Sequence, residues 1–457
     1  MKYRNPKCRW ASMVLAIALW VVVPAMPARD SLKSLGAAIP GVSPVSGAAA
    51  KFFELTTPQA TGPRVITQKD IARGFMSYDG GGGRWKVTNR YLPGDRNFLS
   101  MIYGAASAPD GTLFVAANSI VSASETGRPP RANRDWYADN GRGIWRVAPD
   151  GRVTAFSVRD YFIELKTAVC NVNVAEVAFH SPDRWGGIAV APSGDVYISD
   201  YHFDMILRLR SDGYVEHIAG GGEKACEYEP GKDKKESGYR DGAGRQALFK
   251  DPRGLAFDRQ GNLLVADRGN CALRRIDPAG NVTTLHKGCQ VAPGDAKTPE
   301  KWINFDYVVI DPQGRPVVGG SLVWPSRNIY SNIHRLHPGG RVEQLLSATK
   351  GYSNSGKLRV EFMSGMAYLP NGTLLIADDS NNLLRALSGT RLSDWLGKQG
   401  SQGDEDINGP ASQARLRRPG WLSVSGDGTL FVAPASPRSS PVRKVDGKTR
   451  EVSTWLY

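Results

Sequence analysis

Most motifs that mark a catalytic site are absent from this 457-residue chain. It has no G-x-S-x-G nucleophile turn, no H-E-x-x-H zinc motif and no glycine-rich nucleotide loop between a strand and a helix. Only six histidines are present, and no C-x-x-C pair supplies zinc spacing. Apolar residues at helical spacing are nearly missing after residue 75, which argues for a β fold.

What the chain does contain is a pattern of glycine, short apolar strand, turn ending in glycine, and second apolar strand. The clearest copy spans residues 254–267, and two further strands follow at 273–276 and 282–285. The turn glycine recurs at Gly111, Gly194, Gly261, Gly314, Gly372 and Gly428. Spacings of 53 to 83 residues indicate repeats that cannot bury their apolar faces alone. We therefore expect an all-β, six-bladed β-propeller of four-stranded antiparallel blades over residues 99–457. The blades are expected to begin near residues 101, 184, 251, 304, 362 and 418.

The third unit resembles the NHL repeat in its segments 252–258, 262–270 and 273–277. Its lead-in, residues 241–249, is also similar to the family and returns as residues 408–416. The resemblance covers roughly residues 99–457 and implies an NHL-type propeller of the kind that bacteria export. It is weaker in the fourth and sixth units, where Tyr307 and Trp421 replace the first glycine.

The beginning of the chain is typical of a secretory signal peptide over residues 1–28. Four basic residues precede an apolar run at 13–23 that is short for a membrane span, although an uncleaved anchor is the alternative. No other stretch could cross a membrane. Residues 29–98 are rich in Ala, Pro, Gly and Ser and suit a linker or N-terminal extension. We expect a periplasmic or secreted protein.

The net charge of +14 falls to +10 without the four basic residues of the leader. A basic surface favours anionic partners. The basic residues are spread along the repeats, as in Arg208, Arg274, Arg275 and Arg385, and we expect them on blade exteriors. The expected partner is therefore a protein, a glycan or an anionic small molecule, and not nucleic acid.

Four cysteines follow the leader, at Cys170, Cys226, Cys271 and Cys289. An even number in an oxidising compartment predicts disulfides, and four cysteines allow three pairings. All four lie in loops that a propeller opens on one face, so each pairing is conceivable. We favour Cys271 with Cys289 because both belong to one blade.

A carboxylate ends the second strand in three units, as Asp200, Asp267 and Asp378. Three such groups directed at a common axis could hold a hard cation such as Ca²⁺. The favoured interpretation is that each holds the turn beyond it, since Asn270 and Asn381 repeat three residues on. Propellers similar to this family include lyases and lactonases with a channel metal. The resemblance thus leaves a second function open, a lyase or lactone hydrolase with Ca or Zn in the central channel.

Loops that depart from the repeat are the candidate binding surface, because binding residues concentrate in loops on a rigid scaffold. Aromatic and arginine side chains there suit a ligand or partner surface. We expect a scaffold that binds a ligand or protein through one face, although the same aromatics could instead pack the inserts onto the rim. The candidates follow the second strand of the first, second, third and fourth units: Arg134, Trp136, Tyr137, Tyr201, His202, Phe203, Arg268, Trp324, Arg327 and Tyr330.

Overall fold

The computed structural model describes most of the repeat region and two short segments before it. The described residues are 77–79, 84–86, 98–120, 142–151, 153–159, 172–173, 185–210, 214–222, 236–290, 302–323, 329–354, 358–398, 406–435 and 441–456. The chain divides into two compact units, Met1–Thr56 and Thr57–Tyr457, and every described residue lies in the second. The expected signal peptide lies outside the described residues. Of the expected linker, β1 (Ser77–Asp79) and β2 (Arg84–Lys86) form a small antiparallel sheet.

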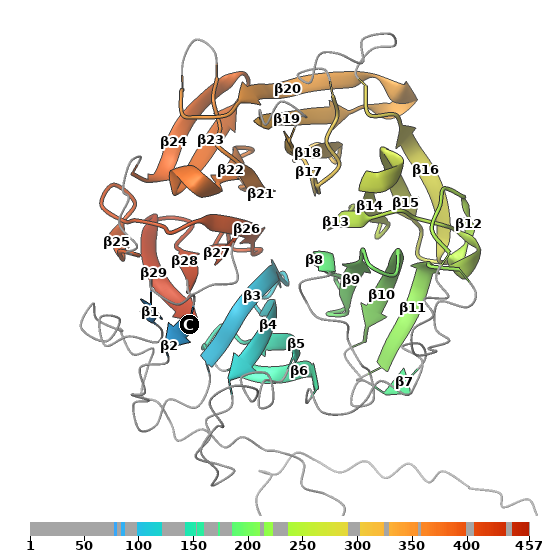
Figure 1. Cartoon of the computed structure of the whole chain (residues 1–457), viewed down its shortest axis with the longest axis horizontal. Helices are drawn as coiled ribbons and strands as arrows, with labels where there is room; N and C mark the ends of the chain where they lie inside the picture. The colour runs from blue at the N-terminus through green and yellow to red at the C-terminus, as the bar shows by residue number, and fades with distance from the viewer. Residues whose placement is uncertain are drawn as a thin grey trace, which may run out of the picture. The chain divides into compact units, whose positions relative to one another are not determined.

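Six antiparallel sheets form a ring of blades, which confirms the six-bladed propeller (Figure 1). Blade 1 comprises β3 (Phe98–Ser107), β4 (Leu113–Ile120), β5 (Arg142–Val147) and β6 (Val153–Arg159). Blade 2 comprises β7 (Val172–Asn173), β8 (Trp185–Val190), β9 (Val196–Asp200), β10 (Met205–Leu209) and β11 (Tyr214–Gly220). Blade 3 comprises β12 (Gly242–Ala243), β13 (Pro252–Phe257), β14 (Leu263–Asp267), β15 (Ala272–Ile276) and β16 (Asn281–Lys287).

The remaining three blades repeat the same order. Blade 4 comprises β17 (Tyr307–Ile310), β18 (Pro316–Val323), β19 (Ile329–Leu336) and β20 (Val342–Thr349). Blade 5 comprises β21 (Met363–Tyr368), β22 (Leu374–Asp378), β23 (Leu383–Ser388) and β24 (Arg391–Gly397). Blade 6 comprises β25 (Gly409–Pro410), β26 (Pro419–Val424), β27 (Leu430–Pro434), β28 (Val442–Val445) and β29 (Glu451–Leu456). The inner strands begin within three residues of the expected positions.

Helix is a minor element in the described ranges, as expected from the missing helical periodicity. It is limited there to 3₁₀ turns at Gly244–Gln246, Arg268–Asn270, Pro338–Gly340 and Asp379–Asn381. None of the described helices has the length and apolarity needed to span a membrane.

The recurrent glycine allows the tight turn between the first and second strands of each blade. All six turn glycines have φ between +81° and +87°, a region that L side chains rarely adopt. In blade 3 the preceding carboxylate completes the turn, because Asp258 Oδ1 accepts the backbone N–H groups of Gln260 and Asn262. The sequence pattern thus predicts the turn through local backbone chemistry.

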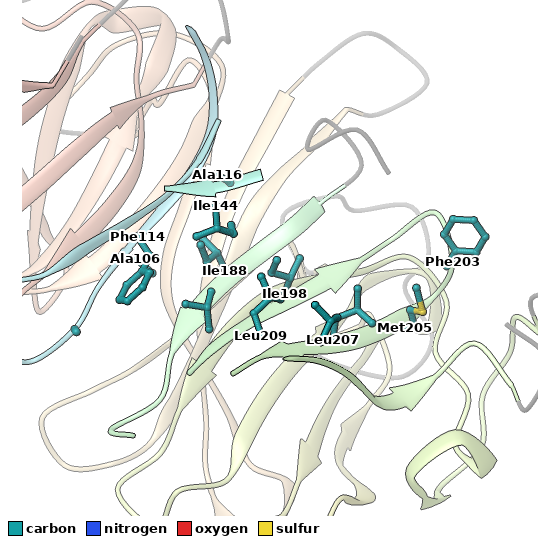
Figure 2. Packing of buried hydrophobic residues seen from close by; sticks show 13 residues of the cluster. Ala106, Phe114, Ala116, Ile144, Ile188, Ile198, Phe203, Met205, Leu207 and Leu209 are labelled. Atoms are coloured by element: carbon teal, nitrogen blue, oxygen red, sulfur yellow. The ribbon is translucent and has the colours of Figure 1, made fainter. Parts of the chain in front are cut away.

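The apolar core lies between blades rather than within them. Between blades 1 and 2, Phe114 and Ile144 pack against Ile198 and Leu207 (Figure 2). Comparable clusters join each of the remaining five pairs of neighbouring blades. The cluster between blades 6 and 1 closes the ring, since Phe431 of blade 6 packs with residues of blade 1. Side chains carry this closure, because the sheet of β26–β29 and that of β3–β6 share no strand.

The register defines one face of the ring. In blades 2, 3 and 5 the first residue of the inner strand pairs with the last residue of the second strand, as Pro252 does with Asp267. The lead-in to each inner strand and the loop after each second strand therefore open on the same face. We call this face, where β8, β13, β17, β21 and β26 begin, the entry face.

Candidate functional site

Half of the sequence-predicted binding residues lie outside the described residues: Arg134, Trp136, Tyr137, Trp324 and Arg327. The proposal that Trp136 and Trp324 share one mouth therefore stays a prediction. Among the others, Phe203 is only 7% exposed and packs in the core between blades 1 and 2 (Figure 2). His202 stacks edge-on against it, with ring centroids 4.9 Å apart. Tyr330 lies within β19, paired with Leu322 and Thr349.

The three strand-end aspartates hold loops inside their own blades. Asp200 Oδ1 accepts the backbone N–H groups of His202 and Phe203 at 2.9 and 3.0 Å. Asp267 accepts the N–H of Lys250, the amide of Asn270 and the guanidinium of Arg274, all within 2.9 Å.

Asp378 repeats this arrangement with Glu361, Asn381 and Arg385. Within the described ranges no three His, Cys, Asp or Glu side chains gather in a way that suits a metal ion. The geometry therefore supports the loop-holding role that the sequence favoured for these carboxylates.

Burial corrects the expectation that Arg274 and Arg385 lie on blade exteriors. Both guanidinium groups are 0% exposed and form ion pairs of 2.8 Å with Asp267 and Asp378. A second terminal nitrogen of Arg274 donates to the lead-in, at Arg240 O and Asp241 Oδ1. A buried guanidinium requires such partners, because desolvating an unpaired charge costs on the order of several kcal/mol.

The entry face carries a second series of polar contacts, each joining one blade to the next. In blades 2, 3 and 5 the residue directly after the second strand reaches the next blade, and in blade 4 the equivalent residue, Ser321 within β18, does so. The Arg253 guanidinium lies 3.9 Å from the ring centroid of Tyr201. Arg268 Nε lies 2.8 Å from Asp306 Oδ1. Ser321 Oγ accepts the N–H of Met363, and Asp379 binds Arg418.

Asp251 places two of these arginines side by side. Its Oδ1 accepts Arg253 Nε at 2.7 Å, and its Oδ2 accepts an N–H of Arg268 at 2.8 Å. The backbone N–H of Asp251 is itself held by Asp204 of blade 2. This shared carboxylate fixes two guanidinium groups at the start of blade 3, with side chains 28% and 46% exposed.

A third arginine is held in blades 5 and 6. Both carboxylate oxygens of Asp379 accept N–H groups of Arg418, at 2.8 and 3.1 Å. Ser364 also donates to Asp379, which is only 5% exposed, whereas the Arg418 side chain is 51% exposed. The bidentate pair orients the guanidinium while part of it faces solvent. We call Arg253, Arg268, Arg418, Asp251, Asp306 and Asp379 the arginine–aspartate network.

Tyr307 and Trp421 lie next to this network. Both side chains are half-buried, and their rings meet edge to face with centroids 6.3 Å apart. Burial, together with the negative charge of Asp306, raises the pKa of Tyr307. The phenol therefore keeps its proton and remains a hydrogen-bond donor.

Electrostatics keep the arginines charged and make one carboxyl easier to protonate. Burial alone would lower the pKa of Arg268, but the charges of Asp306 and Asp251 outweigh it and raise this pKa above its ordinary value. Burial raises the pKa of Asp306 despite the opposing effect of Arg268 and Arg253. The network thus combines three arginines, which stay charged, with one carboxyl, Asp306, whose pKa is raised.

Sequence reasoning identified Arg268 and Tyr201 of this site but missed Arg253, Asp306, Asp379 and Arg418. The signal that was visible is the replacement of a repeat glycine by Tyr307 and Trp421, which marks the same place in the ring. Asp306, Asp379 and Arg253 carry no repeat-level signal, because each differs in type from the equivalent residue of the other blades.

Comparison with known proteins supports the repeat. Residues 249–276 match the NHL repeat family. The chain is 28% identical over 246 residues to the protein SUPPRESSOR OF QUENCHING 1, chloroplastic, of Arabidopsis thaliana. That match covers 48% of this chain and 22% of the relative, so the chain spans about a fifth of the relative's length.

Two solved structures are similar in chain arrangement. Virginiamycin B lyase from Staphylococcus aureus is 9% identical, with a TM-score of 0.40, covering 78% of this chain and 85% of that one. The gluconolactonase XC5397 from Xanthomonas campestris is 13% identical, with a TM-score of 0.38, covering 80% of this chain and 89% of that one.

Proposed function

We propose that this six-bladed propeller, which carries an NHL repeat, is a scaffold that binds a small anionic ligand on its entry face. The observation that supports the proposal is the arginine–aspartate network at the start of blades 3, 4 and 6. Three guanidinium groups are held there in fixed orientations while 28%, 46% and 51% of their side chains stay exposed. Arginine binds carboxylates and phosphates through its planar fork of donors.

Preorganisation is what distinguishes these arginines from ordinary surface charges. Arg268 uses Nε and one terminal N–H for Asp306 and Asp251, which leaves donors of its other terminal nitrogen for a ligand. Arg418 likewise uses two of its nitrogens for Asp379. A ligand therefore meets donors whose side-chain entropy is already lost, which lowers the cost of binding.

We also propose that the protein is exported. The basic leader and apolar run within residues 1–28 support this, and so does the disulfide between Cys271 and Cys289. N-terminal sequencing of the protein recovered from its native compartment tests it. A mature chain that begins near residue 29 supports the proposal, and an intact leader on a membrane-bound chain overturns it.

The ligand proposal is tested by titrating the purified protein with acetate, citrate, benzoate and inorganic phosphate by calorimetry. The variant Arg268→Gln combined with Asp306→Asn removes the cation without leaving a buried carboxylate unpaired. We expect it to lower the affinity for any acid that binds by about tenfold or more, since a charge-assisted hydrogen bond contributes about 1.5–3 kcal/mol.

Arg208→Gln is the matched control. Arg208 is also an exposed, ion-paired arginine, 2.7 Å from Asp195, but it lies on the third strand of blade 2. It should leave affinity within about twofold of wild type. No binding of any probe, or equal losses in both variants, would contradict the proposal. Turnover of a lactone at this site would favour the lyase or lactone hydrolase instead.

A further inference from the structure

Two aromatic residues occupy a register position that holds glycine in the other blades. This position lies on the inner strand, seven residues before the turn glycine of each blade. Its occupants from blade 1 to blade 6 are Gly104, Gly187, Gly254, Tyr307, Gly365 and Trp421. Blades 4 and 6 therefore break the pattern with the two largest kinds of side chain.

In blades 2, 3 and 5 glycine is required because neighbouring inner strands come very close. A Cβ at Gly187 would lie 2.6 Å from Arg253 O, and one at Gly254 would lie 2.7 Å from Val308 N. At Gly365 the distance to Gly420 O would be 2.2 Å. Blades 4 and 6 carry an aromatic ring at this position instead, and the two rings meet each other.

The rings border the charged network directly. Tyr307 follows Asp306 in the chain, and the charges of Asp306, Arg253, Asp379 and Arg268 all act on its hydroxyl. No hydrogen bond to that hydroxyl forms among the described residues. Arg418 lies on the lead-in to blade 6, and Trp421 follows three residues later within β26. A neutral donor, two partly exposed rings and three guanidinium groups thus share one part of the entry face.

We infer that the ligand of this site is a planar aromatic carboxylate. Its carboxylate pairs with the Arg253 and Arg268 guanidinium groups that Asp251 holds side by side, and its ring packs against Tyr307 and Trp421. The Tyr307 hydroxyl donates to the carboxylate or to a ring substituent. This inference rests on the proposed function, because it names the class of anion that the network binds.

The inference follows from two kinds of contact, the ion pairs made by the guanidinium groups and the ring contacts made by Tyr307 and Trp421. Guanidinium groups recognise the carboxylate but do not distinguish an aromatic acid from an aliphatic one. Edge-to-face and offset contacts between aromatic rings contribute beyond the apolar area that they bury. An acid that carries a flat ring therefore binds both the arginines and the aromatic rings. A saturated acid of equal charge gains the ion pairs but not the contacts between aromatic rings.

The test compares benzoate with cyclohexanecarboxylate, which has the same charge and nearly the same size, on the wild-type full chain by calorimetry. We expect benzoate to bind about fivefold to tenfold more tightly. Equal affinities would overturn the inference while leaving the proposed anion site intact. If neither acid binds, the inference fails, and the proposed function fails with it only if acetate, citrate and phosphate do not bind either.

Variants locate the preference. Trp421→Leu should abolish the preference for benzoate and leave the affinity for cyclohexanecarboxylate within about twofold, whereas Arg268→Gln with Asp306→Asn should weaken both acids. Trp395→Leu is the matched control, since Trp395 is likewise half-buried but lies on the outer strand β24, where the Arg450 guanidinium is 4.6 Å from its ring centroid. A preference that survives Trp421→Leu and Tyr307→Leu would overturn the inference. Because the wild-type comparison needs no variant, the inference stays testable if either leucine variant fails to fold.

Discussion

At the residue scale, the buried arginines of the third strands couple each blade to its own lead-in. Arg274, Arg385 and Arg443 are all at most 1% exposed. Arg443 continues the pattern in blade 6, where it pairs with Asp406 at 2.8 Å. In this position arginine is a buried residue that links the third strand to the lead-in, and its charge does not contribute to a basic surface.

Asp267→Ala should strongly destabilise the protein because it leaves the Arg274 guanidinium buried with an incomplete set of partners. The expected loss in the free energy of unfolding is about 3–5 kcal/mol, measured by urea denaturation. Asp277→Ala is the control, since Asp277 is a turn carboxylate of the same blade that bonds Ala279 and Asn281 at the surface. Comparable losses in the two variants would contradict the role assigned to the buried pair.

In blade 4, His334 takes the place of the buried arginine. It pairs with Val318, as Arg274 pairs with Val265, but Gly320 stands where blade 3 has Asp267. Its imidazole is 0% exposed, and neither ring nitrogen has a hydrogen-bond partner in the part of the chain that the structure describes. Burial, with a smaller effect of His286, lowers the pKa of His334 from 6.5 to about 4. A neutral side chain therefore suits a blade that lacks the carboxylate.

A pH dependence follows from this shift. Because the folded pKa lies below the unfolded one, the contribution of His334 to stability is complete above pH 6.5 and is lost as the pH falls toward 4. Between pH 7 and pH 5 wild type should lose about 2 kcal/mol relative to His334→Leu, measured by urea denaturation at each pH. His217, Asp267 and Asp378 titrate in both proteins, so the difference isolates His334. Parallel pH profiles would refute the assignment.

At the element scale, the loop after the second strand is shaped by a residue in the left-handed conformation. Asp204, Cys271 and Asn382 occupy equivalent places and have φ of +55°, +51° and +58°. In blade 3 this residue is also bonded to Cys289, with Cα atoms 5.0 Å apart, which is the pairing that the sequence favoured. The disulfide thereby ties the loop that carries Arg268 to the end of the blade's outer strand.

Replacing both cysteines, as Cys271→Ser with Cys289→Ser, should lower the free energy of unfolding by about 3 kcal/mol. The reason is that the bond closes a loop of 18 residues and restricts the unfolded chain. Thermal unfolding with and without a reductant measures the effect. Reductant should shift the melting temperature of wild type and leave the double variant unchanged; a shift in both would count against this pair.

At the scale of the whole molecule, the ring closes by side-chain packing between its first and last blades. Phe431 is 3% exposed and packs with Leu113, Val115 and Trp145 of blade 1. Since the described strands of the two blades form separate sheets, this junction is held by side chains, through apolar packing and through the hydrogen bonds of Ser107 with Ser423.

Phe431→Ala should therefore cost about 3–5 kcal/mol of unfolding free energy and loosen the closure, because it removes a large buried side chain. Hydrogen exchange should then increase in β3, β4, β27 and β28 before it increases in blades 3 and 4. Leu285→Ala is the control, since Leu285 is 42% exposed and its loss should stay within about 0.5 kcal/mol. Uniform exchange around the ring would contradict a local closure.

The sequence by itself determined the number of blades, the positions of their strands and the turns that join them. Those features depend on local chemistry, because alternation along a strand and a positive φ at Gly261 or Gly372 are set by neighbouring residues. The pairing of Cys271 with Cys289 could also be predicted from the sequence, since both cysteines flank strands of one blade.

Only the tertiary structure decided which polar side chains meet. Arg268 and Asp306, or Asp379 and Arg418, lie in different repeats and come together because adjacent blades converge at the start of their inner strands. The burial of Arg274 likewise depends on a lead-in that folds back over its blade. Such contacts arise from closing the ring, a property of all six blades at once, and no periodicity along the chain records them.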